Sequence, residues 1–112
     1  MSNKPIIYQM LPRIWGNDKI RPRKNATLGE NGSGKFSDID TATLDYLKWL
    51  GCSHVWYTGV LRHSTQASED GCIPSHPQFV KGKAGSPYAI CDYYDVNAYL
   101  ADNPDDRMTE FE

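Results

Sequence analysis

The chain has 112 residues, the length of one small domain, and its 39% hydrophobic and 23% charged residues argue against a disordered tail. Twelve basic and fourteen acidic residues give a formal net charge of −2, so we expect neither nucleic acid nor an anionic membrane surface as a partner. No apolar run approaches the length that spans a bilayer, and the first ten residues lack the apolar core of a secretory signal. We therefore expect a cytoplasmic location.

Residues from about 5 to 12 predict a first strand. The run from Ile6 to Met10 is almost continuously apolar, which is typical of a strand buried on both faces, and Pro12 should fall at or beyond its end. A polar loop of about twenty residues follows, including the basic cluster Lys19–Lys24, which we interpret as solvated.

The stretch "GENGSGKF" within this loop comes close to a phosphate-binding loop. Gly29, Gly34 and Lys35 fit that pattern, but Phe36 stands where a magnesium-binding Ser or Thr is required. A phosphate loop also follows its strand directly. We therefore interpret the stretch as the turn into the next helix, anchored by Phe36, and a nucleotide-binding protein remains an alternative that a magnesium-dependent ATP or GTP titration would test.

Residues from about 38 to 50 predict the best helix, with Asp38 or Asp40 as its cap and Gly51 as its left-handed end. A second buried strand is expected from about 54 to 60. Strand, helix and strand then form a right-handed unit with parallel strands. The apolar stripe expected to face the core consists of Ile39, Leu44, Leu47 and Leu50, and Trp49 and Trp56 are expected to pack.

The remainder predicts an irregular loop from about 61 to 102, because several Gly and Pro residues interrupt any periodicity, and then the start of a helix from about 104 to 112. Asn103 can cap that helix and Pro104 suits its first position. The chain ends after about two turns, which suggests a larger α/β protein interrupted within its second helix.

The three cysteines do not form a disulfide framework, because their number is odd and their spacing wide. One zinc site can be drawn, with Cys72 and His76 joined by His63 or Cys91. A stiff, proline-containing loop argues against it, and we expect no metal; Cys52 and Cys91 are then small buried side chains.

Three segments taken together resemble the opening of the α-amylase family of glycoside hydrolases: "IIYQMLPRIW", "GSGKFSDIDTATLDYLKWLGCSHVWYTGV" and "GSPYAICDYYDVNAYLADNPDDRMTEFE". The resemblance covers most of the chain, in order. It implies that residues 1–112 are the N-terminal fragment of a catalytic TIM (β/α)8 barrel, of which this chain holds the opening β-α-β portion.

The resemblance also implies the chemistry. Family members cleave α-linked glucans such as maltooligosaccharides with retention, using carboxylates on the fourth, fifth and seventh strands. Because this chain reaches only the second strand, it holds no catalytic residue and we expect it to be inactive alone. No cofactor is expected in the fragment, whereas calcium is compatible with the full-length enzyme.

Within the "SPYAICDYY" block, Tyr88 matches the family tyrosine that stacks under the sugar, and Asp92 matches an aspartate expected to hold the loop by hydrogen bonds. Tyr93, Tyr94 and Val96 are expected to pack.

Ala89 replaces the aspartate that α-glucosidases often carry after the tyrosine, which favours an amylase- or neopullulanase-like enzyme. His63 lies just past the second strand, and we leave it out of the site as an exposed loop histidine. The alternative function is a noncatalytic carbohydrate-binding or interaction module. In either case the uncovered apolar faces predict that the fragment self-associates.

Overall fold

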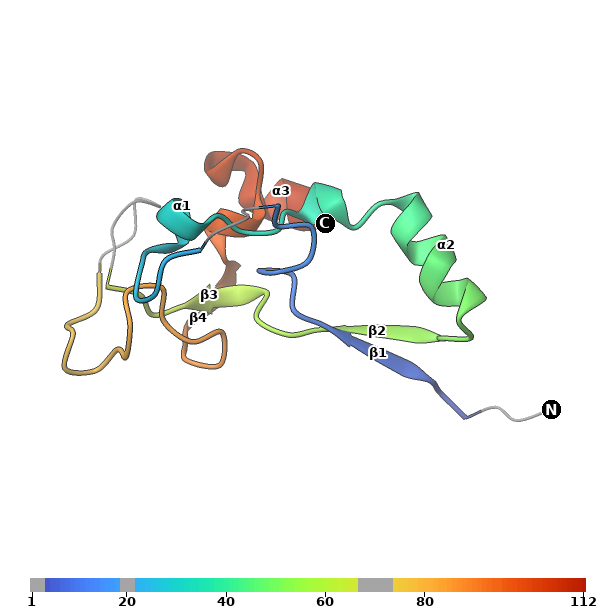
Figure 1. Cartoon of the computed structure of the whole chain (residues 1–112), viewed down its shortest axis with the longest axis horizontal. Helices are drawn as coiled ribbons and strands as arrows, with labels where there is room; N and C mark the ends of the chain where they lie inside the picture. The colour runs from blue at the N-terminus through green and yellow to red at the C-terminus, as the bar shows by residue number, and fades with distance from the viewer. Residues whose placement is uncertain (1–3, 19–21, 67–73) are drawn as a thin grey trace.

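A computed structural model describes residues 4–18, 22–66 and 74–112. The molecule is elongated, with extents of 51 × 29 × 27 Å and a radius of gyration of 15.2 Å, against about 13 Å for a compact domain of this length. Figure 1 shows why: one strand–helix–strand unit extends to the right, and the other elements gather at the opposite end. We call the extended unit the arm and the remainder the body.

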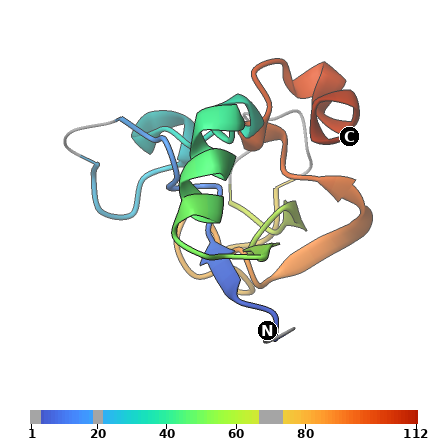
Figure 2. The same cartoon turned by 90° about the vertical axis from the view of Figure 1, so that its right-hand side faces the viewer.

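The arm consists of β1 (Ile7–Met10), α2 (Thr41–Trp49) and β2 (His54–Tyr57). The strands pair in parallel, from Ile7 opposite His54 to Met10 opposite Tyr57, and the N–H of Thr58 extends the ladder by donating to the Met10 carbonyl at 2.8 Å. In the view of Figure 2, α2 lies between α1 and α3. The predicted parallel pairing is therefore present, and Pro12 follows the strand as expected.

The ends of α2 follow from local chemistry. The Asp40 carboxylate accepts from the Thr43 N–H at 2.9 Å, and Gly51 adopts a φ of 95° just beyond the helix, as predicted. The apolar stripe behaves differently. Leu47 is buried, but Leu44 and Leu50 remain 44% and 49% exposed, so most of the stripe is not core-facing.

The arm strands are not buried on both faces, which corrects the sequence-based expectation. Ile7 is 54% exposed and Trp56 is 58% exposed, and Trp49 on α2 reaches 78%. A parallel pair needs cover on each face, and the described residues provide little of it here. The two tryptophans expected to pack therefore lie at the surface.

The expected irregular loop at 61–102 is wrong at both of its ends, whereas residues 64–66 and 74–89 form no helix or strand. Leu61–His63 form β3, which pairs antiparallel with β4 (Ile90–Val96), and a 3₁₀ turn covers Ala98–Leu100. The predicted second strand ends at Tyr57, before this pairing starts. Register irregularities within β3–β4 and the surrounding Gly and Pro residues obscured the strand pattern in the sequence.

The hydrophobic core lies mainly in the body. The last strand and the 3₁₀ turn contribute its most buried side chains, and α1 (Leu28–Asn31), capped by the Thr27 hydroxyl, adds one apolar side chain. The core residues of the body are Ala26, Leu28, Val60, Val80, Val96, Ala98, Leu100 and Ala101.

The chain then forms a 3₁₀ turn at Pro104–Asp106 that continues into α3 (Arg107–Phe111). Asn103 caps it as predicted, accepting from the Asp105 N–H. The Phe111 ring lies 5.7 Å from the Phe36 ring, so Phe36 does anchor the turn that precedes α2. None of the helices within the described residues is long and apolar enough to cross a membrane.

The glycine at position 34 serves packing rather than phosphate binding. A Cβ there would lie 2.0 Å from the carbonyl oxygens of Pro12 and Trp15, so only glycine permits this approach. The Lys35 ammonium donates to the Tyr99 carbonyl at 2.6 Å. The lysine that a phosphate loop would use is therefore engaged with the backbone.

Candidate functional site

The carboxyl ends of β1 and β2 are tied together by polar side chains. The Gln9 amide donates to the Thr58 hydroxyl at 2.8 Å, and Thr58 is buried. This bond continues the strand pairing one residue past β2. The carboxyl edge of the parallel pair is thus well defined, and it is the edge at which ligands bind in α/β folds.

A glycine brings a distant loop to this edge. Gly59 has a φ of 81°, and a Cβ on it would lie 2.5 Å from the Pro87 Cβ. The Pro87–Tyr88 segment can therefore approach β2 only because residue 59 lacks a side chain. The Tyr88 N–H donates to the Ser86 hydroxyl at 3.2 Å, which further defines the loop.

Tyr88 lines a hollow of about 260 Å³ at this place. Tyr88 is 74% exposed, so its side chain is accessible to a ligand. The wall combines aromatic rings with the hydroxyl groups of Tyr57, Thr58 and Tyr88, a composition that suits a ring with an apolar face and polar edges. The lining residues are Trp56, Tyr57, Thr58, Gly59, Val60, Leu61, Pro87, Tyr88 and Ile90.

A larger hollow of about 660 Å³ lies along the arm and is lined by apolar side chains apart from His54. It offers few polar groups that could orient a polar ligand. We therefore place the candidate ligand site at Tyr88 and regard the larger hollow as uncovered apolar surface.

Asp92 lies in β4, opposite Arg62 in the strand register. Its carboxylate accepts from the Tyr94 N–H at 2.9 Å, a bond that stays within β4. In the described residues, no hydrogen bond joins Asp92 to the loop that carries Tyr88. Tyr88 and Asp92, the two residues suggested by the family resemblance, are therefore not joined by a hydrogen bond in the described residues. Asp92 instead stabilises β4 itself.

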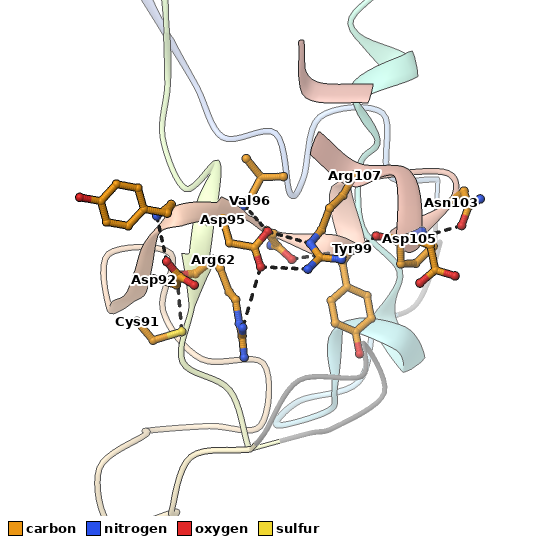
Figure 3. Close-up of polar contacts among 12 residues, drawn as sticks. Arg62, Cys91, Asp92, Asp95, Val96, Tyr99, Asn103, Asp105 and Arg107 are labelled. Atoms are coloured by element: carbon orange, nitrogen blue, oxygen red, sulfur yellow. Dashed lines mark hydrogen bonds and ion pairs between the residues drawn. The ribbon is translucent and has the colours of Figure 1, made fainter. Parts of the chain in front are cut away.

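The carboxylate of β4 that forms ion pairs is Asp95, a partly buried residue that the sequence did not single out. Arg107 binds it with two bonds, Nε to Oδ1 at 2.8 Å and Nη2 to Oδ2 at 3.0 Å, and Arg62 Nη1 lies 3.8 Å from Oδ2. Figure 3 shows Asp95 between the two arginines. The charge at position 95 is neutralised and ties β4 to α3 and β3.

The pKa of Asp95 is lowered chiefly by the hydrogen bond from Arg107. Burial opposes this shift, and the Val96 N–H and the charges of both arginines reinforce it. Asp95 is therefore ionised at neutral pH and paired. A general acid would require the opposite shift, so this carboxylate has a structural role.

His63 is 5% exposed, which corrects its reading as an exposed loop histidine. It lies in β3, and its Nε2 is 2.8 Å from the Ala84 carbonyl oxygen. The histidine thus contacts the backbone of the loop at Ala84 and does not line the Tyr88 hollow.

The expected packing was also wrong for two tyrosines and two cysteines. Tyr93 and Tyr94 are 71% and 94% exposed, although Val96 beside them is buried as expected. Cys91 is an exposed thiol and Cys52 is half-buried, so neither is a small core residue. These side chains lie on elements that the described residues cover only in part.

No group of three or more His, Cys, Asp or Glu side chains in residues 4–18, 22–66 and 74–112 is placed to hold a metal ion. Cys72, which the drawn zinc site required, lies outside the described residues.

The site can therefore recognise a ring by stacking and by hydrogen bonds to hydroxyl groups of its wall. Neither carboxylate of β4 lines the hollow, so it has no acid/base pair from that strand. Comparisons with family models, with curated proteins and with solved structures find no match to this chain.

Proposed function

We propose that this chain provides the opening part of the catalytic barrel of a retaining α-glucan hydrolase of the α-amylase type, and that Tyr88 stacks against a glucose unit of the substrate. One observation carries the proposal: an exposed tyrosine ring lines a hollow at the carboxyl edge of a parallel β-α-β unit. The ordered motifs of the sequence supply the family resemblance, and the position and exposure of Tyr88 support its role.

The physical basis is the amphipathic character of a sugar ring. Its apolar C–H face packs on an aromatic ring, while its hydroxyl groups need polar partners at the edge. Tyr88 offers the first contact, and Thr58 is a hydroxyl in the same hollow. The loop is held by the close approach of Gly59 to Pro87, so little ordering entropy is lost on binding.

Retaining hydrolysis requires two carboxyl groups about 5–5.5 Å apart, one as nucleophile and one as acid/base. In this chain Asp95 is bound by arginines and Asp92 caps the Tyr94 N–H. We therefore expect binding without hydrolysis. Reducing sugar released from starch by the purified chain would contradict this part of the proposal.

The test is a titration with maltopentaose followed by NMR. Tyr88→Ala should weaken binding about tenfold, because it removes the stacking face and about 1.5 kcal/mol with it, whereas Tyr88→Phe should bind like the wild type. Tyr94→Ala is the matched control, since Tyr94 is even more exposed than Tyr88 but lies on β4. Unchanged affinity of Tyr88→Ala would overturn the proposal.

The second candidate, a noncatalytic carbohydrate-binding module, is favoured by the exposure of Tyr93 and Tyr94. Successive strand residues point to opposite faces, so only one of the two could contact a given ligand. If Tyr93→Ala or Tyr94→Ala weakens binding of maltopentaose and Tyr88→Ala does not, the carbohydrate-binding module becomes the better proposal than the hydrolase.

The cytoplasmic location stays a prediction. The free thiols Cys52 and Cys91 are compatible with a reducing compartment.

A further inference from the structure

A second hollow, of about 250 Å³, lies between the segment that follows β1, the region of α1 and the loop at residues 81–85. Its wall contains three cationic residues and no carboxylate, in a chain whose net charge is negative. It shares no lining residue with the Tyr88 hollow. The lining residues are Arg13, Asn25, Ala26, Asn31, Lys81, Gly82, Lys83, Ala84 and Gly85.

Arg13 is the least exposed of these cations. Its side chain is half-buried, and its Nη1 donates to the Gly85 carbonyl at 3.0 Å. Among the described residues it forms no ion pair. A guanidinium carries five N–H donors, so most of them are left for another acceptor. Burial lowers the pKa of Arg13, which reflects a charge removed from water without a compensating anion.

The loop that carries the two lysines is held in place by its backbone. The Lys83 N–H donates to the Asn25 side chain at 3.2 Å, and the Lys83 carbonyl accepts from the Gln66 N–H at 3.1 Å. A Cβ on Gly85 would lie 2.0 Å from the Ser64 carbonyl oxygen. Two separate segments, at Asn25 and at residues 64–66, thus position this loop before any ligand binds.

The neighbouring acidic side chain does not neutralise the hollow. Glu30, on α1, is engaged by Arg23 in an ion pair, and Glu30 is not among the lining residues. The side chain of Asn31 is likewise engaged, since it exchanges hydrogen bonds with the backbone of Arg23. The positive charge of Arg13 and the lysines therefore faces the hollow without a described counter-ion.

We propose that this hollow is a binding site for a small tetrahedral oxyanion, phosphate or sulfate, with Arg13 as the bidentate donor and Lys81 and Lys83 as additional charges. Guanidinium groups match oxyanion geometry with two parallel N–H···O bonds, and ammonium groups act as point charges beside them. This site goes beyond the proposed sugar contact, and its test does not depend on hydrolase function.

The experiment is isothermal titration calorimetry of the full chain with inorganic phosphate, in a phosphate-free buffer of low ionic strength. We expect saturable binding to one site with a millimolar dissociation constant. Arg13→Gln should weaken it at least tenfold, and the double variant Lys81→Ala/Lys83→Ala should do the same. Lys48→Ala is the matched control, because it removes one cation from α2 in the arm and should leave affinity unchanged.

Absence of saturable phosphate binding by the wild type would overturn the proposal. Equal weakening by Lys48→Ala would overturn it too, because that would indicate nonspecific attraction. Arg13 also bonds Gly85, so Arg13→Gln can disturb folding, which circular dichroism would reveal. In that case the double variant Lys81→Ala/Lys83→Ala is the deciding one, because both side chains are exposed and their removal should not disturb folding. Unchanged phosphate affinity of this double variant overturns the proposal. Sulfate titrated in parallel should compete with phosphate for the same site.

Discussion

The arm and the body of this molecule both contain large apolar side chains, but the body buries them and the arm leaves many of them exposed. In the body, Val96 and Leu100 are at most 2% exposed, whereas Trp49 and Trp56 in the arm are 78% and 58% exposed. Both regions obey the same local rules for strands and helices. The difference shows that a correctly formed element is not automatically a buried one.

The reason lies in the strand topology of each region. The body contains an antiparallel pair, which tolerates one solvated face, and its core closes around the 3₁₀ turn at Ala98–Leu100. The arm contains a parallel pair, a type of sheet found almost only with both faces covered. Within the described residues α2 buries only Leu47 to a comparable degree.

The largest expected effect is on the stability of the body. Leu100→Ala should reduce the free energy of unfolding by about 2–5 kcal/mol, because it leaves a cavity at a fully buried position. Leu50→Ala, at a half-exposed position in the arm, should cost about 1 kcal/mol. Urea denaturation followed by circular dichroism measures both. Equal losses would mean that the arm is as well packed as the body.

Gly34 and Gly51 are glycines for different reasons: a Cβ does not fit at position 34, whereas position 51 has an unfavourable φ for other residues. Substitutions at the two positions separate these causes. Gly34→Ala should cost about 3 kcal/mol, because two backbone oxygens of the body occupy the Cβ position. Gly51→Ala in the arm should cost about 1 kcal/mol, since space is open there and only the φ of 95° is unfavourable. Gly51→Asn should recover part of that loss in the same urea measurement, whereas Gly34→Asn should not.

The Asp95 ion pairs should make the body's stability depend on pH. The folded pKa of Asp95 lies below its unfolded value of about 3.9, so its contribution is complete above that value and lost as pH falls through the lower folded pKa. Asp95→Asn should cost about 2 kcal/mol at pH 7. The difference in the free energy of unfolding between the wild type and the variant should stay constant from about pH 5 to 7 and decrease below about pH 4. A difference that increased in acid would contradict this assignment.

The smallest stability effect is expected at the exposed face of the arm. Trp56→Lys should change the free energy of unfolding by about 0.5 kcal/mol or less, yet it should reduce the self-association that this apolar face favours. Sedimentation velocity over a range of concentrations measures the association. Tyr94→Lys on β4 is the control, and a wild type that stays monomeric throughout would remove the basis of this expectation.

The signals that predicted local elements correctly are short in range. Asp40, Gly51 and Asn103 act on backbone groups a few residues away, so their roles follow from neighbouring residues alone. The strand at Ile90–Val96 was missed because its partner, Leu61–His63, is remote in sequence and the pairing between them is irregular. The residue pattern of one segment does not show which distant segment it pairs with.

The candidate site was predictable only in part. Tyr88 was chosen from the sequence by resemblance, and its stacking role stays a prediction, but its position beside β2 depends on the close approach of Gly59 and Pro87. Asp95 was passed over because nothing in "DYYDV" identifies which aspartate will meet Arg107. The hollow around Arg13 was also missed, since its cations come from separate segments.

By itself the sequence determined where α2 starts and ends, that β1 and β2 flank it, and that Asn103 and Pro104 open the last helix, because hydrogen bonds between near neighbours decide such features. Only the tertiary structure decided which apolar residues are buried, which carboxylate is paired and why residue 34 is glycine. Each of these depends on groups remote in sequence, whose approach is set by packing of the whole chain.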